Sequence, residues 1–406
     1  MAERNHNINN NIFSVHKRNT WLLFLVIIAF PIWISFLYIR RNKWKKYQNI
    51  LIIQQAMIGD LLCTTPMMRA IKKNNPNVKL TVCVNTYTEN VLKNNPHVDK
   101  ILVIDRQINY NLVQIIKLIA RITQFKFDCC FIANDEQEWI AISLLAGIPL
   151  RVGIRPPIPH TFQKYFGRLL TDEVVIKFGE NSSLARIRLL NILDIHSDDI
   201  DPEIYWEKIN IMKVNDYFTL KKISILYPMI AITPKTGVSF KDWDEMRWVD
   251  VADKLSKHFK TKIFFLGSHK DESAIKSIQE RMKYPSYSVA GQFSINELAY
   301  FLSKCNLHIS SDTGPLFVAS AVKIPCVVLA GPNPRSNLNH LTNVEIISKD
   351  LSCYPCHYVF QTTDKCMNEF SPFACKTETS VDDVFNAAVQ VLAKFNAHIH
   401  KNDTGY

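Results

Sequence analysis

Three short segments bring acidic, basic and small residues together, each directly after an apolar run. Asp60 follows a glycine after ILII, Lys235 and Lys241 share a loop after MIAIT, and the triplet DTG at 312–314 comes after LHIS. A carboxylate beside a glycine can act as a general base on a closely approaching ligand. Lysines and free backbone N–H groups at a helix start bind phosphate. These residue types indicate a base on one side and a phosphate-binding surface on the other.

Each segment also has a structural interpretation. Asp60 can cap the helix that begins there, satisfying free backbone donors. The triplet DWD at 242–244 looks like a metal-binding DxD, but Asp244 opens the next helix and is better explained as its cap. The DTG triplet is also the signature of aspartic proteases, which need two copies in a β-rich fold. A strand before it and a helix after it argue against a protease here.

The segments are expected to be held by alternating strands and helices. Short, continuous apolar runs indicate strands of a parallel sheet covered on both faces, and helical spacing appears between them, as in 111–125. The fold class is therefore α/β, with two Rossmann-like halves facing a common cleft. The expected strands are 50–53, 80–84, 100–104 and 127–133, then 229–233, 262–266, 307–310 and 325–330, with a last helix at 381–395.

The middle of the chain, 151–226, lacks this rhythm and is expected to be a connector. Its IRPPIPH stretch precludes regular structure, and no acidic residue occurs between Trp139 and Thr171. A solvated basic loop and a docking surface for an anionic acceptor or a bilayer are both open. The basic candidates are Arg151, Arg155, Lys164 and Arg168.

The composition and the first residues of the chain indicate its partners and its location. The chain has 406 residues, of which 47% are hydrophobic, and a formal net charge of +11, which points to anionic partners. Residues 20–39 carry no charge over a length that spans a bilayer as a helix. The basic collar at 40–46 is richer in Lys and Arg than the preceding flank. The positive-inside rule then places residues 40–406 in the cytoplasm.

Ten cysteines fit a reducing compartment if most are reduced. Six sit in apolar runs and are typical of core residues. The other four cluster in one polar stretch. They are interpreted either as the ligands of a structural metal site or as thiols that pack a loop. They are Cys353, Cys356, Cys366 and Cys375.

Two long segments resemble a known family. ILIIQQAMIGDLLCTTPMMRAIKKNNPNVKLTV resembles the amino-terminal signature of glycosyltransferase family 9, the lipopolysaccharide heptosyltransferases, and ISSDTGPLFVASAVKIPCVVLAGPNP resembles the carboxyl-terminal one. KDWDEMRW resembles the Lys-containing donor loop, and the likeness covers about residues 48–396 in order. It implies a GT-B fold, inverting transfer without a metal or cofactor, an ADP-heptose donor and a lipopolysaccharide core acceptor. Nucleic acid is not an expected partner.

The resemblance implies roles for residues of this chain. Asp60 would deprotonate the acceptor hydroxyl, and Lys241 would neutralise the departing diphosphate. Thr313 and Gly314 would bind that diphosphate through backbone N–H groups, and Asp312 would hold hydroxyls of the donor sugar. The other donor-side candidates are Lys235, for phosphate, and Asp271 and Glu272, for the ribose hydroxyls.

Two features depart from the family pattern. Phe317 stands where members usually have His, and the donor loop has Pro-Lys-Thr-Gly at 234–237 in place of Pro-Gly. Both departures bear on the identity of the transferred sugar more than on the type of reaction. A nucleotide-sugar epimerase on the same architecture and a catalytically inactive sugar-nucleotide binding protein are the alternatives.

The expected organisation has three parts. Residues 1–47 form a membrane anchor, with a transmembrane helix at about 20–39 and a collar that contacts membrane lipids. Residues 48–225 form the acceptor domain and residues 226–406 the donor domain. The expected location is the inner membrane, single-pass, with the catalytic domains in the cytoplasm.

Overall fold

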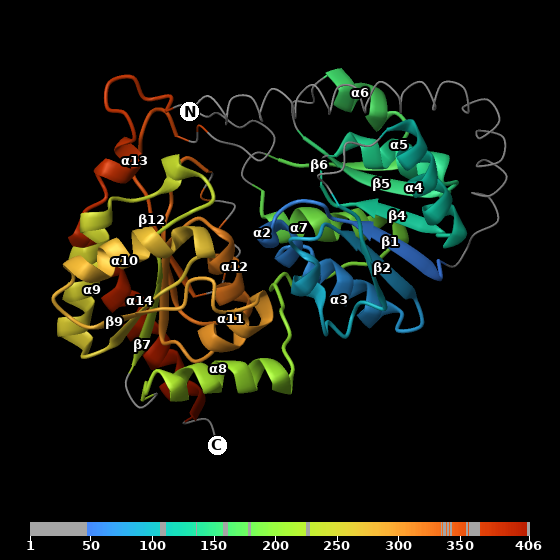
Figure 1. The fold of residues 1–406 in the computed structure, drawn as a ribbon. Coiled ribbons are helices and arrows are strands. Elements are labelled where there is room, and N and C mark those ends of the chain that lie inside the picture. Colours follow the sequence, from blue (N-terminus) through green and yellow to red (C-terminus); the bar gives the residue numbers. More distant parts are fainter. Residues whose placement is uncertain are drawn as a thin grey trace.

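The structure is a computed structural model. It describes residues 47–105, 111–134, 136–156, 161–177, 180–224, 228–333, 335, 338, 341, 343–354, 356 and 366–403. These residues form two six-stranded, wholly parallel sheets, one in each half of the chain (Figure 1). The expected α/β architecture with two Rossmann-like halves is confirmed.

The first sheet has the strand order β3-β2-β1-β4-β5-β6. Its central strand β1 is buried on both faces from Ile50 to Ile53, because helices cover each side. The strands are β1 (Asn49–Ile53), β2 (Lys79–Val84), β3 (Lys100–Val103), β4 (Cys129–Ile132), β5 (Leu150–Arg155) and β6 (Asp172–Val175). The helices are α2 (Ile58–Leu62), α3 (Thr65–Asn74), α4 (Leu112–Gln124), α5 (Gln137–Leu145), α6 (Thr161–Gly167) and α7 (Ser182–Ile187), with 3-10 turns η1 (Glu89–Leu92) and η2 (Arg188–Leu193).

The second sheet has the order β12-β11-β10-β7-β8-β9. Its central strands β7 and β10 are fully buried. The strands are β7 (Met229–Thr233), β8 (Lys262–Phe265), β9 (Ser286–Ser288), β10 (Leu307–Ser311), β11 (Cys326–Leu329) and β12 (Val344–Ile347). The helices are α9 (Glu245–Phe259), α10 (Glu272–Arg281), α11 (Ile295–Leu302), α12 (Gly314–Ala321), α13 (Ala374–Thr377) and α14 (Val381–Asp403), with η3 (Ser239–Lys241) and η4 (His269–Asp271).

Helix α8 (Lys208–Leu220) precedes the second sheet in the chain but packs against it (Figure 1). The Tyr217 hydroxyl donates to the Ser288 carbonyl at 2.8 Å, and the Phe218 ring stacks on Phe301 with centroids 5.9 Å apart. Helix α8 therefore contacts the second half, although it lies within the expected acceptor domain, and the expected division between 225 and 226 stays a prediction.

The middle segment is more regular than expected. β5 and β6 extend the first sheet within 151–226, so the expectation of a plain connector there is wrong. β5 carries an Arg and a Gly inside LRVGIR, and β6 is a largely exposed edge strand. Neither has the continuous apolar run by which the other strands of this sheet were predicted.

One hydrophobic cluster joins the two halves. It runs from Leu61 and Leu62 of α2 to Leu316 of α12, with Ile58 and Phe317 packed against it. In Figure 1, α2 and α12 face one another between the two sheets. The turn after β1 is thereby brought to the turn after β10.

The expected membrane placement needs correction. The proposed spanning helix at about 20–39 and the basic collar lie outside the described residues. Within the described ranges, the helices include none that is both long enough and apolar enough to cross a bilayer. We therefore withdraw the single-pass inner-membrane location and the lipid contacts that were assigned to the anchor.

Candidate active site

Asp60 lies in the first turn of α2, at the carboxyl edge of the first sheet. The residue in the cap position is Met57, so the interpretation of Asp60 as the helix cap is wrong. Its carboxylate Oδ1 instead accepts a hydrogen bond from Nη2 of Arg186 at 3.0 Å. The Asp60 side chain is about one third exposed, at 31%, so it remains accessible to a ligand. The arrangement suits a base whose orientation is fixed by one of its two oxygens.

Arg186 comes from α7 and was not singled out in the sequence. Its side chain is only 7% exposed, and Nη1 donates to the Ser182 carbonyl at 2.8 Å. The buried Nε has no hydrogen-bond partner among the described residues. Arg186 is thus a largely buried cation aimed at the carboxylate of Asp60. No local pattern in its helix marks it, because its partner lies in a distant segment.

Hydrogen bonds tie α2 to the sheet beneath it. The Thr64 hydroxyl donates to the Asp60 carbonyl at 2.7 Å. Nε2 of Gln54, which is fully buried, donates to the Thr64 hydroxyl at 3.0 Å and to the Ala133 carbonyl at 3.1 Å. The backbone that carries Asp60 is therefore fixed relative to the ends of β1 and β4.

On the opposite side, the DTG triplet forms the turn from β10 into α12. Asp312 Oδ2 lies 3.9 Å from Nζ of Lys241 and accepts a hydrogen bond from the amide of Asn333. Thr313 is the N-cap of α12 and Gly314 its first residue, so the free N–H groups of the helix start there. The two predicted donor residues Lys241 and Asp312 are thus neighbours beside a helix N-terminus.

A second lysine lies beneath Lys241. Lys376 of α13 is buried; its Nζ donates to the Lys241 carbonyl and lies 3.3 Å from the Ser311 hydroxyl. Burial lowers the pKa of the Lys376 amine to about 8. A Cβ at Gly331 would come within 3.2 Å of Cε of Lys376, so glycine makes room for it. Sequence reasoning missed Lys376, although it adjoins Cys375 of the cysteine cluster.

Lys235 is paired with two acids, one in its own loop and one at the start of α9. Its Nζ lies 3.5 Å from Asp242 and 3.2 Å from Glu245. Partial burial opposes the charged form, but the hydrogen bond to Glu245 and the charges of both acids raise the pKa of Lys235. Asp242 also accepts from the Thr236 amide at 2.7 Å and so organises the loop. The expected cap is confirmed: Oδ1 of Asp244 accepts from the Arg247 amide at 3.1 Å.

Asp271 is the last residue of the turn η4 after β8, and Glu272 is the first residue of α10. Asp271 Oδ2 accepts from the amide and the hydroxyl of Ser268, both at 2.7 Å. Glu272 Oε1 lies 2.8 Å from Nδ1 of His269. Both carboxylates have local partners in this turn, so their assignment to ribose hydroxyls stays a prediction.

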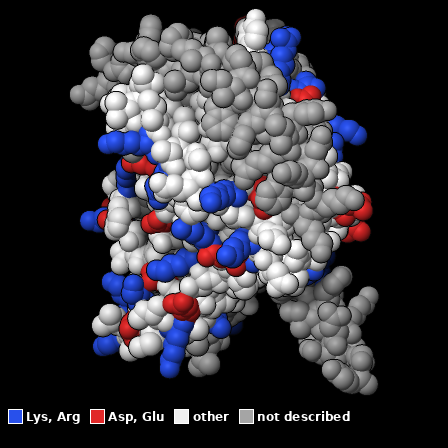
Figure 2. Space-filling view, turned by 90° about the vertical axis from the view of Figure 1, so that its right-hand side faces the viewer, with Lys and Arg blue, Asp and Glu red and all other residues white. Residues whose placement is uncertain are grey.

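The four basic residues predicted to bind the acceptor do not form one cluster. Arg151 is buried, and its guanidinium donates to the carbonyls of Ile148 at 2.7 Å and Leu169 at 2.8 Å, so we remove it from the acceptor contacts. Lys164 lies in α6 and Arg168 directly after its end, and both are exposed. On the face shown in Figure 2, the described Lys and Arg side chains lie among Asp and Glu.

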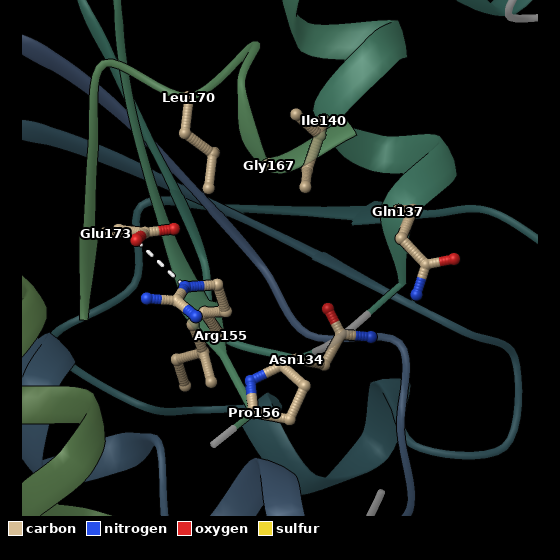
Figure 3. A pocket seen from close by; sticks show the side chains of 9 residues that line it. Asn134, Gln137, Ile140, Arg155, Pro156, Gly167, Leu170 and Glu173 are labelled. Atoms are coloured by element: carbon tan, nitrogen blue, oxygen red, sulfur yellow. Dashed lines mark hydrogen bonds and ion pairs between the residues drawn. The ribbon is translucent and has the colours of Figure 1, made fainter. Parts of the chain in front are cut away.

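Arg155 lies at a recess that sequence reasoning did not anticipate (Figure 3). The recess opens at the carboxyl ends of β4 and β5, and Arg155 Nε donates there to Glu173 Oε1 at 2.8 Å. Asn134 lies opposite and is 8% exposed. The lining residues are Asn134, Gln137, Ile140, Ile154, Arg155, Pro156, Gly167, Leu170 and Glu173.

Phe317, which stands where family members usually have His, packs against the first half of the chain. A Cβ built on Gly59 would lie 2.8 Å from Cδ2 of Phe317, so the ring packs directly over the glycine that precedes Asp60.

The four clustered cysteines are free thiols. Among the described residues, which include all four, no three His, Cys, Asp or Glu side chains are placed to hold a metal ion.

Comparisons with known proteins agree with this architecture. The model of glycosyltransferase family 9 (heptosyltransferase) matches residues 116–366, more than half of the chain. The chain is 24% identical to lipopolysaccharide heptosyltransferase 3 of Escherichia coli over 67% of this chain and 80% of that protein. A family 9 glycosyltransferase structure from Veillonella parvula aligns with a TM-score of 0.72 at 18% identity, covering 86% of this chain and 99% of that one. The structure of E. coli ADP-heptose lps heptosyltransferase II aligns with a TM-score of 0.68 at 17% identity. That alignment also covers 86% of this chain and 99% of the other.

Proposed function

Because the chain belongs to glycosyltransferase family 9, the heptosyltransferase family, we propose that it transfers heptose, or a related sugar, from an ADP-sugar to the core of lipopolysaccharide. The observation that carries this proposal is the placement of two groups on facing turns. Asp60 lies on α2 of the first half, and the Lys241–Asp312 pair lies beside the start of α12 in the second. The Escherichia coli relative named above is a lipopolysaccharide heptosyltransferase, which supports heptose as the transferred sugar and lipopolysaccharide as the acceptor.

The proposed reaction is a single displacement with inversion. Asp60 takes the proton from an acceptor hydroxyl, and the hydroxyl oxygen attacks the anomeric carbon of the donor sugar. The bond between that carbon and the diphosphate oxygen breaks, and ADP leaves with the electron pair. Arg186 holds one oxygen of the Asp60 carboxylate at 3.0 Å, which directs the other toward the acceptor. The reaction class then needs one base, which Asp60 supplies.

Charge on the departing diphosphate is stabilised from the second half. Lys241 supplies a cation, and Thr313 and Gly314 supply backbone N–H groups at the start of α12. Asp312 accepts from hydroxyls of the donor sugar. Protein groups fixed in place before the reaction do not have to reorganise as charge develops. We therefore propose transfer that does not depend on a divalent metal.

The test measures ADP release by the purified full chain with ADP-heptose and extracted core acceptor. We expect release to require acceptor, to continue in the presence of EDTA, and to fall by roughly 10²–10⁴-fold in Asp60→Ala, which removes the base. The matched control is Asp216→Ala on the exposed side of α8, which should behave as wild type.

The alternatives give different results in the same assay. Turnover of the sugar nucleotide without acceptor would favour an epimerase. ADP-heptose that binds but is not consumed under any of these conditions would favour an inactive binding protein. Either result would overturn the proposed transfer.

A further inference from the structure

The recess between β4, β5 and α5 contains a polar side chain that nothing in the fold explains. We propose that the recess binds hydroxyl groups of an uncharged sugar unit of the acceptor, next to the hydroxyl that is attacked. The inference rests on the proposed function, because it assumes a saccharide acceptor. It gives a role to Asn134 and Glu173, which had none, and a specific partner to Arg155, which was so far only a candidate for acceptor binding.

Asn134 carries the first part of the argument. It is 8% exposed, and both its amide nitrogen and its amide oxygen are buried without a hydrogen-bond partner among the described residues. Most buried polar groups in folded proteins are paired, so an amide with both ends unpaired is unusual. Satisfying both ends needs a ligand that donates and accepts. A hydroxyl does both, a phosphate ester dianion only accepts, and an ammonium group only donates.

The opposite wall of the recess is electrically balanced. Arg155 donates from Nε to Glu173 Oε1 at 2.8 Å, so the pair presents a cation and an anion side by side. In Figure 3 this pair lies across the recess from the amides of Asn134 and Gln137. A site for phosphate would carry an excess of positive charge. The balanced pair instead offers both donors and acceptors, which fits vicinal hydroxyls.

The remaining lining is apolar. Leu170 and Ile140 point toward the recess in Figure 3, and Pro156 lies at its edge. The space inside the recess is only about 20 Å³, enough for a hydroxyl group but not for a sugar ring, so the rest of a bound saccharide would lie outside, against the mouth. A sugar ring has a hydroxyl edge and faces of C–H groups. The lining matches that combination of surfaces.

Position assigns the ligand to the acceptor. Asn134 directly follows Ala133, whose carbonyl accepts from Gln54 at 3.1 Å. Gln54 also donates to Thr64 at 3.0 Å, and Thr64 donates to the Asp60 carbonyl at 2.7 Å. β4 pairs directly with β1, so the recess and the proposed base lie at the ends of adjacent strands. All the lining residues belong to the first half, whereas the predicted donor residues belong to the second.

Asn134→Leu tests the proposal, because leucine is similar in size but has no polar atoms. We expect the variant to raise the KM for acceptor by about ten- to a hundredfold, the effect of losing two hydrogen bonds, and to leave the KM for ADP-heptose unchanged. Its melting temperature should equal or exceed that of wild type, since the substitution removes two unpaired buried atoms. Asn215→Leu, on the exposed surface of α8, is the matched control for both measurements.

A binding measurement separates this inference from the proposed function. Core oligosaccharide that has been dephosphorylated should raise the melting temperature of wild type and Asn215→Leu but not that of Asn134→Leu, while ADP should raise all three. Saccharide binding without any transfer by wild type would defeat the proposed function and leave the inference standing. An unchanged acceptor KM and an unchanged saccharide shift in Asn134→Leu would overturn the inference alone.

Two further outcomes also decide it. A lower melting temperature in Asn134→Leu, with weaker binding of ADP and saccharide alike, would mean that Asn134 supports the fold, and would overturn the proposal. Inorganic phosphate that raises the melting temperature of wild type but not that of Asn134→Leu would overturn the assignment to uncharged hydroxyls. Glu173→Gln gives a second variant, which should weaken saccharide binding because Arg155 loses its counter-charge.

Discussion

A buried lysine under the predicted donor loop has consequences that can be titrated. Burial lowers the pKa of Lys376 from its ordinary value of 10.5 to about 8, so between these pH values the unfolded chain binds more protons than the folded one. The free energy of unfolding should therefore rise with pH across that window, by at most about 3 kcal/mol. Urea denaturation of wild type and Lys376→Met at pH 7, 8, 9 and 10 measures this directly.

The variant provides the control for that titration. In Lys376→Met the pH-dependent gain from this group should vanish, whatever other groups titrate in the same range. Equal slopes in the two proteins would contradict the assignment. Because Lys376 loses its positive charge beside Lys241 as pH rises through about 8, the affinity for the anionic ADP should also fall in wild type. Lys376→Met should lose that dependence.

At the scale of single elements, the approach of α2 to α12 depends on Gly59. A Cβ there would lie 2.8 Å from Cδ2 and 2.9 Å from Cε2 of Phe317, so the ring or the helix must move. We expect Gly59→Ala to lower the free energy of unfolding by about 1–3 kcal/mol, as for other overpacked contacts. Adding Phe317→Leu should restore much of the loss, since leucine lacks the ring atoms that clash.

Denaturation with urea shows whether the contact with Phe317 causes the loss of stability. Gly237→Ala is the control for stability, because a Cβ at Gly237 meets nothing within 4 Å. A Gly59→Ala variant as stable as wild type would show that the ring moves at little cost. A double variant no more stable than Gly59→Ala would show that Phe317 is not the cause.

The elements also show what could be predicted from sequence. Eight strands were expected from continuous apolar runs, and a strand lies at each of those places, because burial on both faces of a parallel sheet demands such runs. β5 was missed because Arg151 interrupts its pattern, yet Arg151 remains buried by donating to backbone carbonyls. Gly153 in the same strand leaves space for Leu170, whose Cδ1 would lie 2.8 Å from an added Cβ.

The candidate site likewise contains residues that could be predicted from the sequence and residues that could not. Asp60, Lys241 and Asp312 stand at strand-to-helix turns, where type and spacing are informative from the sequence. Arg186, Lys376 and Asn134 gain their significance from contacts with residues far along the chain, or from the lack of a contact inside a recess. Such properties need the folded structure.

At the scale of the whole molecule, the two halves share a continuous apolar core. One hydrophobic cluster includes Leu61 of the first half and Leu316 of the second, and α8 packs on α11 after leaving the first sheet. Separating the halves would expose that shared apolar surface to water, which is unfavourable. We therefore expect the described part of the chain to unfold as one cooperative unit.

Ligand binding provides the test, since the predicted ADP-binding groups lie in the second half alone. ADP at a hundredfold excess over its Kd stabilises the state that binds it by about 2.7 kcal/mol. If the halves unfold together, native-state hydrogen exchange should show that protection in β1 and β4 as well as in β7 and β10. Protection confined to β7 and β10 would mean that the first half opens independently. The shared cluster from α2 to α12 would then be too weak to couple the proposed base to the donor side.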